Sequence, residues 1–252
     1  EVVRLESVAE SVAASGCEPA EFADRYADAL HTAVAAAGAV GVKSVAAYRV
    51  GLDLPADAPT RQEVKTAAQA WLDRGPAAHG WRLDEPVLTR ALVWSAVEVG
   101  LPIQFHCGFG DRDLRLHKAN PILLSDLIAA VPATVPIMLL HCYPYHREAG
   151  YLAAVFPNVY VDVGLALNFV GPSRARAVLA EVLELTPFAK LLYSSDAFGL
   201  PELYYLSALV FRREFGGFLD ERVDSGEWSA DDALRIAAMV GSRNAARAYG
   251  LD

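Results

Sequence analysis

Three apolar stretches of this sequence each lead into a side chain that can bind a metal ion. The stretch IQFHCGFGD contains His106, the stretch IMLLHCY contains His141, and the stretch LLYSSDAFG contains Asp196. Imidazole and carboxylate groups are common ligands of catalytic zinc, manganese or iron, which keep one coordination position open for water. We therefore predict that these three residues bind a divalent metal ion, with zinc favoured and manganese as the alternative.

Such an ion would prepare a water molecule for hydrolysis, because it lowers the pKa of bound water towards ~7 and polarises a carbonyl group. A nearby carboxylate must then take the proton of the water and deliver it to the leaving group. Asp196 is the predicted base, and His141 is the second predicted catalytic residue. Asp196 also has a structural alternative, since its surroundings suit the N-cap of a helix over Ala197–Leu206.

β-Strands that alternate with helices must position these residues. Strands are predicted over Val42–Val50, Ile103–Cys107, Ile137–Cys142, Val159–Gly164 and Leu191–Ser195. Two helices are predicted within residues 1–37, and others over residues 60–73, 84–100, 122–131, 147–156, 173–185, 202–215, 229–240 and 243–249. This alternation calls for a parallel sheet with helices outside it.

The five predicted strands suit either a (β/α)8 barrel or a doubly wound sheet. The barrel is favoured, because it places functional side chains at the C-terminal ends of several strands. Side chains alternate between the two faces of a strand, so His106, His141 and Asp196 are expected to point to the same region. We predict one domain over residues 1–252, with the functional atoms of the three residues within roughly 8 Å of a common point.

The composition indicates a globular chain that acts on a small molecule. Of its 252 residues, 54% are hydrophobic and 21% are charged, which is enough to bury a full core. The net charge is −9, and no run of Lys or Arg marks a site for nucleic acid or for an anionic membrane. The least charged segment, Leu127–Leu140, is shorter than the ~20 residues that a bilayer requires.

The three cysteines lack the CxxC spacing of a zinc knuckle and are odd in number, which argues against a disulfide scaffold. This pattern predicts a reducing, cytoplasmic location. The expected partner is a small-molecule substrate, with neither nucleic acid nor membrane, and homo-oligomer formation is left open.

From Gly41 to Leu251 the chain resembles the amidohydrolase superfamily, in its amidohydrolase-related (amidohydrolase 2) branch, whose domain also occurs fused to glutamine-synthetase-like domains. The motifs that carry the resemblance are GVKSVAAYRVGLD, PIQFHCGFGDRD, LLHCYPYHREAGYLAAVFPNVYVDVG, LLYSSDAFGLPELYY and RNAARAYGL. The resemblance implies a (β/α)8 barrel with metal-dependent chemistry.

The resemblance also assigns roles to individual residues. It implies that His106 and His141 are the histidines of strands 5 and 6, and that Asp196 is the aspartate of strand 8. Lys43 falls where some relatives carry a carboxylated lysine that bridges two metal ions. It begins its predicted strand, however, so Arg49 is better placed to face a substrate and is the predicted substrate-binding residue.

The chain departs from the family at the first metal motif, the His-x-His pair that ends strand 1. His31 and His79 are isolated, and neither belongs to such a pair. The first three βα units of the barrel also have no counterpart, and five strands cannot close an eight-stranded barrel. We therefore expect the sequence to be a fragment of a longer barrel domain.

The predicted function is metal-dependent hydrolysis of an amide or related C–N bond in a small acidic substrate. The first alternative is a metal-dependent decarboxylase of an aromatic or unsaturated acid, which could use the same residues. The second is a non-catalytic barrel domain that has lost its first metal ligands, since a fold alone does not assign an activity.

Overall fold

Six short strands, taken in sequence order, make up the parallel sheet of this computed structural model, which describes residues 1–251. They are β1 (Val2–Arg4), β2 (Gly41–Ser44), β3 (Ile103–Cys107), β4 (Ile137–His141), β5 (Val159–Asp162) and β6 (Leu191–Leu192). β1 pairs in parallel with β2, β2 with β3, and β5 with β6. The predicted α/β class is confirmed, and the sequential strand order is that of a barrel rather than of a doubly wound sheet.

Two compact units can be distinguished along the chain. The first comprises Glu1–His106, Gly110–Ala119 and Leu123–Ile137, and the second comprises Cys107–Phe109, Asn120–Ile122 and the residues from Met138 onward. The organisation of residues 1–252 as one domain stays a prediction. None of the helices within residues 1–251 is both long and apolar enough to cross a bilayer.

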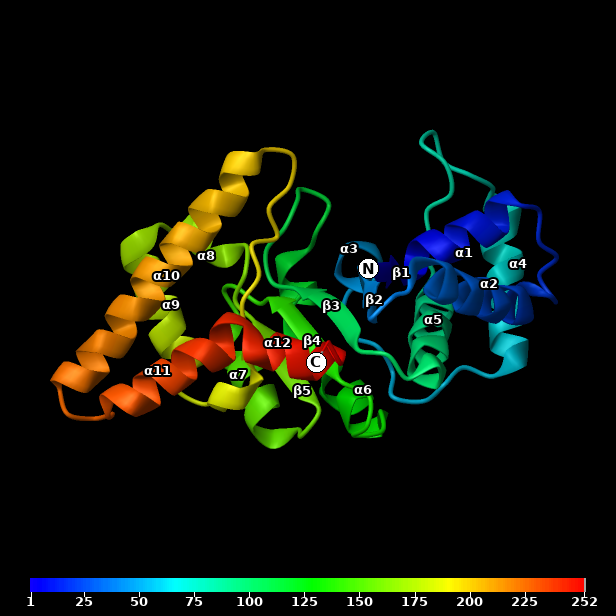
Figure 1. The fold of residues 1–252 in the computed structure, drawn as a ribbon. Coiled ribbons are helices and arrows are strands. Elements are labelled where there is room, and N and C mark those ends of the chain that lie inside the picture. Colours follow the sequence, from blue (N-terminus) through cyan, green and yellow to red (C-terminus); the bar gives the residue numbers. More distant parts are fainter. Residues whose placement is uncertain (252) are drawn as a thin grey trace. The chain divides into compact units, whose positions relative to one another are not determined.

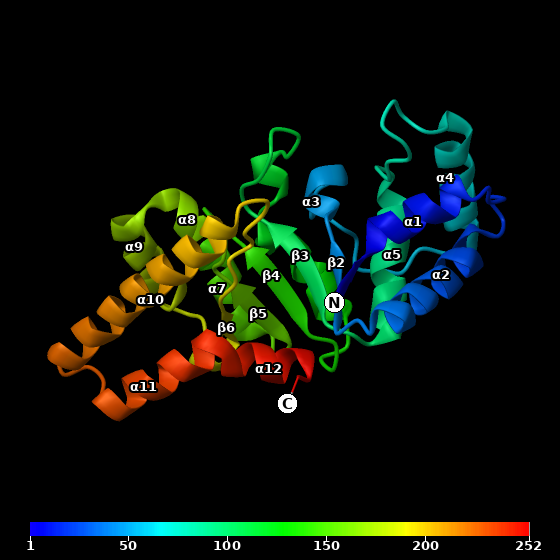
Figure 2. The same cartoon turned by 45° about the horizontal axis from the view of Figure 1, so that its top comes forward.

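In the first unit, helices lie beside the strands (Figure 1). These are α1 (Leu5–Ala14), α2 (Phe22–Ala37), α3 (Ala46–Arg49), α4 (Arg61–Arg74), α5 (Pro86–Val99) and α6 (Ser125–Ala130), with a 3-10 turn at Leu116–Lys118. Helices α1, α2, α4 and α5 lie side by side (Figures 1 and 2). Trp71 of α4 is buried among them and meets the Phe22 ring edge-on, with 5.9 Å between the ring centroids.

The second unit carries the remaining helices. These are α7 (His146–Val155), α8 (Ala166–Val170), α9 (Pro172–Val182), α10 (Pro201–Asp224), α11 (Ala230–Ala238) and α12 (Asn244–Tyr249), with a 3-10 turn at Phe188–Lys190 and a π-helical turn at Met239–Arg243. A further 3-10 turn, Pro121–Leu124, precedes α6. The long helix α10 runs along α9 (Figure 1).

The first predicted element is wrong, because Val2–Arg4 forms a strand rather than the start of a helix. Three residues carry too little periodicity to identify a strand, and this one exists because Val3 is paired with Val42 of β2. The sheet therefore has six strands rather than the five predicted. An eight-stranded barrel would need two more strands, not three.

The second predicted strand, Val42–Val50, is also wrong in its extent, since β2 ends at Ser44 and α3 follows. The Ser44 hydroxyl accepts a bond from the Ala46 N–H at 3.1 Å, which turns the chain out of the strand. It also donates to the Glu6 carboxylate at 2.8 Å, and the Val45 N–H donates to the same oxygen at 2.9 Å. Buried Glu6 therefore sets the position of α3.

Helix α10 continues to Asp224, past its predicted end at residue 215. Arg176 of α9 explains the difference, because its guanidinium lies where a Cβ at Gly217 would be, 2.5 Å from that position. The same guanidinium pairs with Glu214 at 3.0 Å and with Glu221 at 2.5 Å. Gly217 therefore allows close packing of α9 on α10 instead of ending the helix.

Glu6→Gln is expected to make the free energy of unfolding less dependent on pH. Burial raises the pKa of Glu6 above its ordinary value of 4.5, so the folded protein holds this proton to a higher pH than the unfolded chain does. The contribution of protonated Glu6 to the free energy of unfolding is complete below the ordinary pKa. It is lost as the pH rises through the raised pKa of the folded protein. In urea denaturation, the free energy of unfolding of the variant should increase relative to that of the wild type between pH 5 and pH 8. The same difference in free energy between the two proteins at pH 5 and at pH 8 would contradict this prediction.

Thr60→Ala is expected to destabilise the first unit by about 1 kcal/mol, because it removes a capping box. The Thr60 hydroxyl accepts the Glu63 N–H at 3.2 Å, and the Glu63 carboxylate accepts the Thr60 N–H at 2.7 Å. Thr66→Ala, on an exposed turn of the same helix, is the matched control and should change stability by less than about 0.5 kcal/mol. Equal losses in the two variants would show that the cap is unimportant.

Candidate active site

β4 ends in a sharp turn that holds His141. The strand is wholly buried, and His141 and Cys142 then take left-handed conformations, with φ of 68° and 61°. Non-glycine residues rarely adopt this conformation, and where they do, the strain is often part of a functional site. The turn is fixed to the chain after β3, because the Cys142 N–H donates to the Cys107 carbonyl at 3.2 Å.

The second unit brings His141 and Asp196 together. His141 Nε2 and Asp196 Oδ2 are 3.6 Å apart, and their side chains are 1% and 40% exposed. Asp196 follows β6 and also has a left-handed backbone, with φ of 45°. The imidazole is thus shielded from water while the carboxylate remains accessible, which suits a base that must reach a substrate.

Asp162, at the end of β5, supports the other side of the His141 ring. Its Oδ1 lies 4.0 Å from His141 Nδ1 and accepts bonds from the Gly164 N–H at 2.8 Å and the Ser194 hydroxyl at 3.0 Å. Burial raises the pKa of Asp162 to about 6, even though these bonds favour its ionised form. A carboxylate behind a histidine is the usual way in which the orientation of a metal ligand is fixed.

Gly164 is required by this arrangement. A Cβ at this position would lie 2.4 Å from the Ser194 carbonyl oxygen and 2.8 Å from Asp162 Oδ1. A side chain here would therefore force apart the ends of β5 and β6. The motif VDVG thus combines buried Asp162 with Gly164, and only glycine, which has no Cβ, leaves space there for the carboxylate.

His106 lies near the end of β3 in the first unit and is 5% exposed. Its ring centroid is 4.6 Å from that of Tyr48 on α3. A Cβ at Gly110 would fall 2.0 Å from the Tyr48 hydroxyl and 3.1 Å from His106 Nε2, so this glycine gives Tyr48 access to the histidine. The sequence did not identify Tyr48, because its partner is 58 residues away along the chain.

The donor set can be tested against the needs of a metal ion. Bonds of ~2.1 Å that meet at a tetrahedral angle place two donor atoms about 3.4 Å apart, close to the 3.6 Å between His141 Nε2 and Asp196 Oδ2. These two residues therefore fit a shared ion. Across residues 1–251, however, no three His, Cys, Asp or Glu side chains are grouped closely enough to hold one. His106 belongs to the other unit, so its convergence with the pair stays a prediction.

Two further residues of the first unit were considered from the sequence. Arg49, the predicted substrate-binding residue, lies on α3, where its guanidinium is 3.1 Å from Glu10 and mostly buried. Burial lowers the pKa of Arg49. Lys43 was predicted to begin its strand, but it is the third of the four residues of β2, next to the end, and is in register with Gln104 of β3. The roles of Arg49 and Lys43 towards a substrate or a metal stay predictions.

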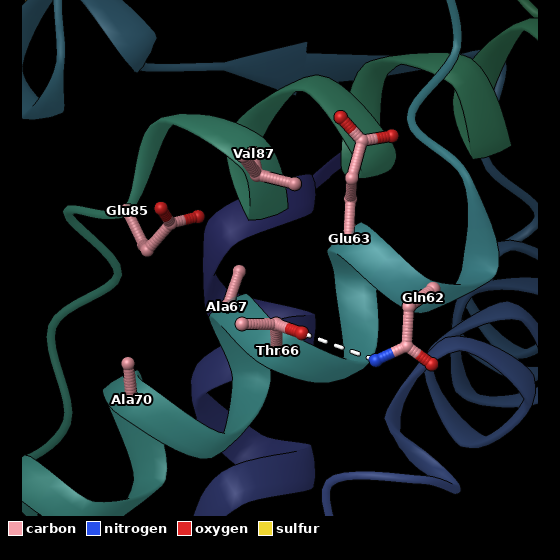
Figure 3. A pocket seen from close by; sticks show the side chains of 7 residues that line it. All are labelled: Gln62, Glu63, Thr66, Ala67, Ala70, Glu85 and Val87. Carbon is pink, nitrogen blue, oxygen red and sulfur yellow. Dashed lines mark hydrogen bonds between the residues drawn. The ribbon is translucent and has the colours of Figure 1, made fainter.

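A groove of about 400 Å³ between α4 and α5 contains none of the predicted site residues. Figure 3 shows its two carboxylates, Glu63 and Glu85, on either side of an apolar floor. Both carboxylates already cap helices, since Glu63 accepts the Thr60 N–H at 2.7 Å and Glu85 accepts the Leu88 N–H at 2.7 Å. The His141–Asp196 pair is therefore the better candidate for catalysis.

Comparison with known proteins places this geometry in context. Residues 7–251 match the Amidohydro_2 family model, described as amidohydrolase. Protein fluG of Emericella nidulans is 34% identical over 241 residues, which are 92% of this chain and 28% of fluG. The chain thus spans less than a third of that relative.

Solved structures show the same likeness. A Lactobacillus casei protein regarded as a metal-dependent hydrolase has 33% identity and a TM-score of 0.86, over 99% of this chain and 65% of that one. Glucuronate isomerase of Caulobacter crescentus has a TM-score of 0.69 at 16% identity, over 92% of this chain and 51% of that one. At this low identity the isomerase shows a shared fold only.

Proposed function

Because the chain belongs to the amidohydrolase family, we propose that it is a metal-dependent hydrolase that cleaves an amide or related C–N bond in a small acidic substrate. The observation that carries the proposal is the His141–Asp196 pair, in which a shielded imidazole and an accessible carboxylate are 3.6 Å apart. Such a pair can hold an ion and move a proton at the same place. Zinc is the proposed ion, with manganese as the alternative.

A bound divalent ion would supply Lewis acidity and a water molecule of lowered pKa. Residues of the chain would transfer the proton and position the groups that hold the ion. Asp196 Oδ2 takes the proton of the attacking water and later delivers it to the nitrogen of the leaving amine. Asp162 keeps the His141 ring in place, and Ser194 and Gly164 keep Asp162 in place through their bonds to its Oδ1.

The acidic character of the substrate is a separate part of the proposal. Arg49, the predicted substrate-binding residue, carries a positive charge that could attract a carboxylate. In the structure this guanidinium is paired with Glu10, which balances its charge within the first unit. Arg49 could therefore serve a substrate only if that ion pair opened.

Metal analysis combined with a screen of amides tests the proposed function. The protein should contain zinc or manganese and release amine from an N-acyl amino acid or dicarboxylic acid amide. A chelator should stop the release, and the added metal should restore it. Release of carbon dioxide from aromatic acids, without amine release, would favour a decarboxylase. A metal-free protein without turnover would favour a non-catalytic domain.

A further inference from the structure

Three aromatic residues of the second unit form a cluster. It consists of Phe109 after β3, Tyr143 after β4 and Phe169 on α8. The Phe109 and Tyr143 ring centroids are 6.2 Å apart, and those of Phe109 and Phe169 are 5.3 Å apart, both in edge-to-face geometry. Phe109 thus joins the other two rings into one apolar surface.

The backbone fixes the first two rings. The Phe109 N–H donates to the Tyr143 carbonyl at 2.7 Å. Gly108 makes this approach possible, since it has a left-handed φ of 76° and a Cβ there would lie 2.3 Å from the same carbonyl oxygen. Tyr143 also stacks on the ring of buried His146, whose Nε2 lies 2.6 Å from a Glu181 oxygen. Phe109 and Tyr143 therefore form a rigid wall.

The wall adjoins the proposed catalytic residues. Tyr143 follows His141 by two positions, directly after the left-handed turn at the end of β4. On the other side, the Asn168 side chain donates to the Ser195 carbonyl at 3.3 Å. This bond connects α8, the helix of Phe169, to the segment that carries Asp196.

One ring of the cluster faces water. Phe169 is 71% exposed, although a phenyl ring is more stable when it is buried, whereas Phe109 and Tyr143 are half-buried. Aromatic side chains next to a few polar groups are typical of the lining of small-molecule sites. A ring or branched alkyl group bound against Phe169 and Phe109 would remove this surface from water.

We propose that the substrate carries an aromatic or branched apolar group next to the bond that is cleaved, and that Phe109, Tyr143 and Phe169 form the subsite for this group. The inference rests on the proposed function and specifies its substrate class. In the reaction the amide C–N bond breaks and a C–O bond to water forms, and Asp196 transfers one water proton to the amine nitrogen. The apolar group leaves unchanged on one of the two products.

Two amides of the same acid, N-benzylsuccinamate and N-methylsuccinamate, test the subsite by equilibrium binding. The wild type should bind the benzyl amide at least tenfold more tightly, since aromatic contact adds about 1.4 kcal/mol to the binding free energy. Phe169→Ala should remove most of this preference. Tyr151→Ala replaces an exposed aromatic residue on α7 outside the cluster and should leave the preference intact.

The results separate the subsite from the proposed activity. Equal binding of the two amides, no binding of either, or an unchanged preference in Phe169→Ala would overturn the subsite. Amine release is measured in the same samples. Preferential binding of the benzyl amide without release of amine would support the subsite and count against the hydrolase. Release of amine from both amides at equal kcat/KM would support the hydrolase and count against the subsite.

Discussion

Replacing Asp196 with asparagine is expected to lower kcat by about 10²-fold or more while leaving most of the metal bound. The amide keeps the size of the side chain and one oxygen that can face the ion. It cannot accept the proton of water, so the proposed reaction loses its base and then its acid. The loss should fall on kcat more than on KM, because the substrate contacts proposed above do not involve this carboxylate.

Asp220→Asn is the matched control for this prediction, since Asp220 is exposed on α10 in the same unit. It should turn over at the wild-type rate. If Asp196→Asn did the same, the base would lie elsewhere, and His141 would be the next residue to test. An inactive Asp196→Asn that had also lost its metal would show that Asp196 acts mainly as a ligand.

Asp162→Asn is expected to weaken metal binding by about 10- to 100-fold, the range found when the partner of a ligand histidine is changed. Asp162 and His141 Nδ1 are 4.0 Å apart, so the negative charge stabilises the ring in the orientation that presents Nε2 to Asp196. An asparagine retains an oxygen for Gly164 and Ser194 but has no charge. Metal titration with a competing chelator measures the change.

Ser194→Ala provides the control for Asp162→Asn. It removes the 3.0 Å bond to Asp162 without removing the charge, and should therefore weaken metal binding much less. Thermal denaturation of both variants checks that the fold is retained. Equal metal affinity in Asp162→Asn and the wild type would show that this carboxylate has only a structural role.

The sequence predicted best the strands and helices that local sequence signals determine. The runs IQFHC and IMLLH are continuous and apolar, and they form β3 and β4 as expected. Helix α4 was predicted to within one residue at each end because its capping box is local. Elements that depend on distant partners were predicted less well. β1 requires pairing with β2, and α3 requires the carboxylate of Glu6.

The site shows the same division between local and distant causes. The sequence placed His141 and Asp196 at the ends of two strands, and the structure brings them together. It could not reveal their left-handed backbones, because this conformation is uncommon even for His and Asp, which adopt it more often than most non-glycine residues. A carboxylate in the apolar strand VYVDVG indicates either a partner of a metal ligand or a buried, hydrogen-bonded residue, and Asp162 could be identified from the sequence only to that extent. Its partner Ser194 lies 32 positions away and is brought near by the pairing of β5 with β6.

Anomalous X-ray diffraction from crystals grown with zinc would locate the proposed metal ion. One zinc ion is expected within about 2.2 Å of both His141 Nε2 and an Asp196 oxygen, with an open position for water. Further donors would be seen in the same map, and His106 is the one expected. A protein that releases amine while its anomalous map shows no metal within about 4 Å of His141 and Asp196 would contradict the account.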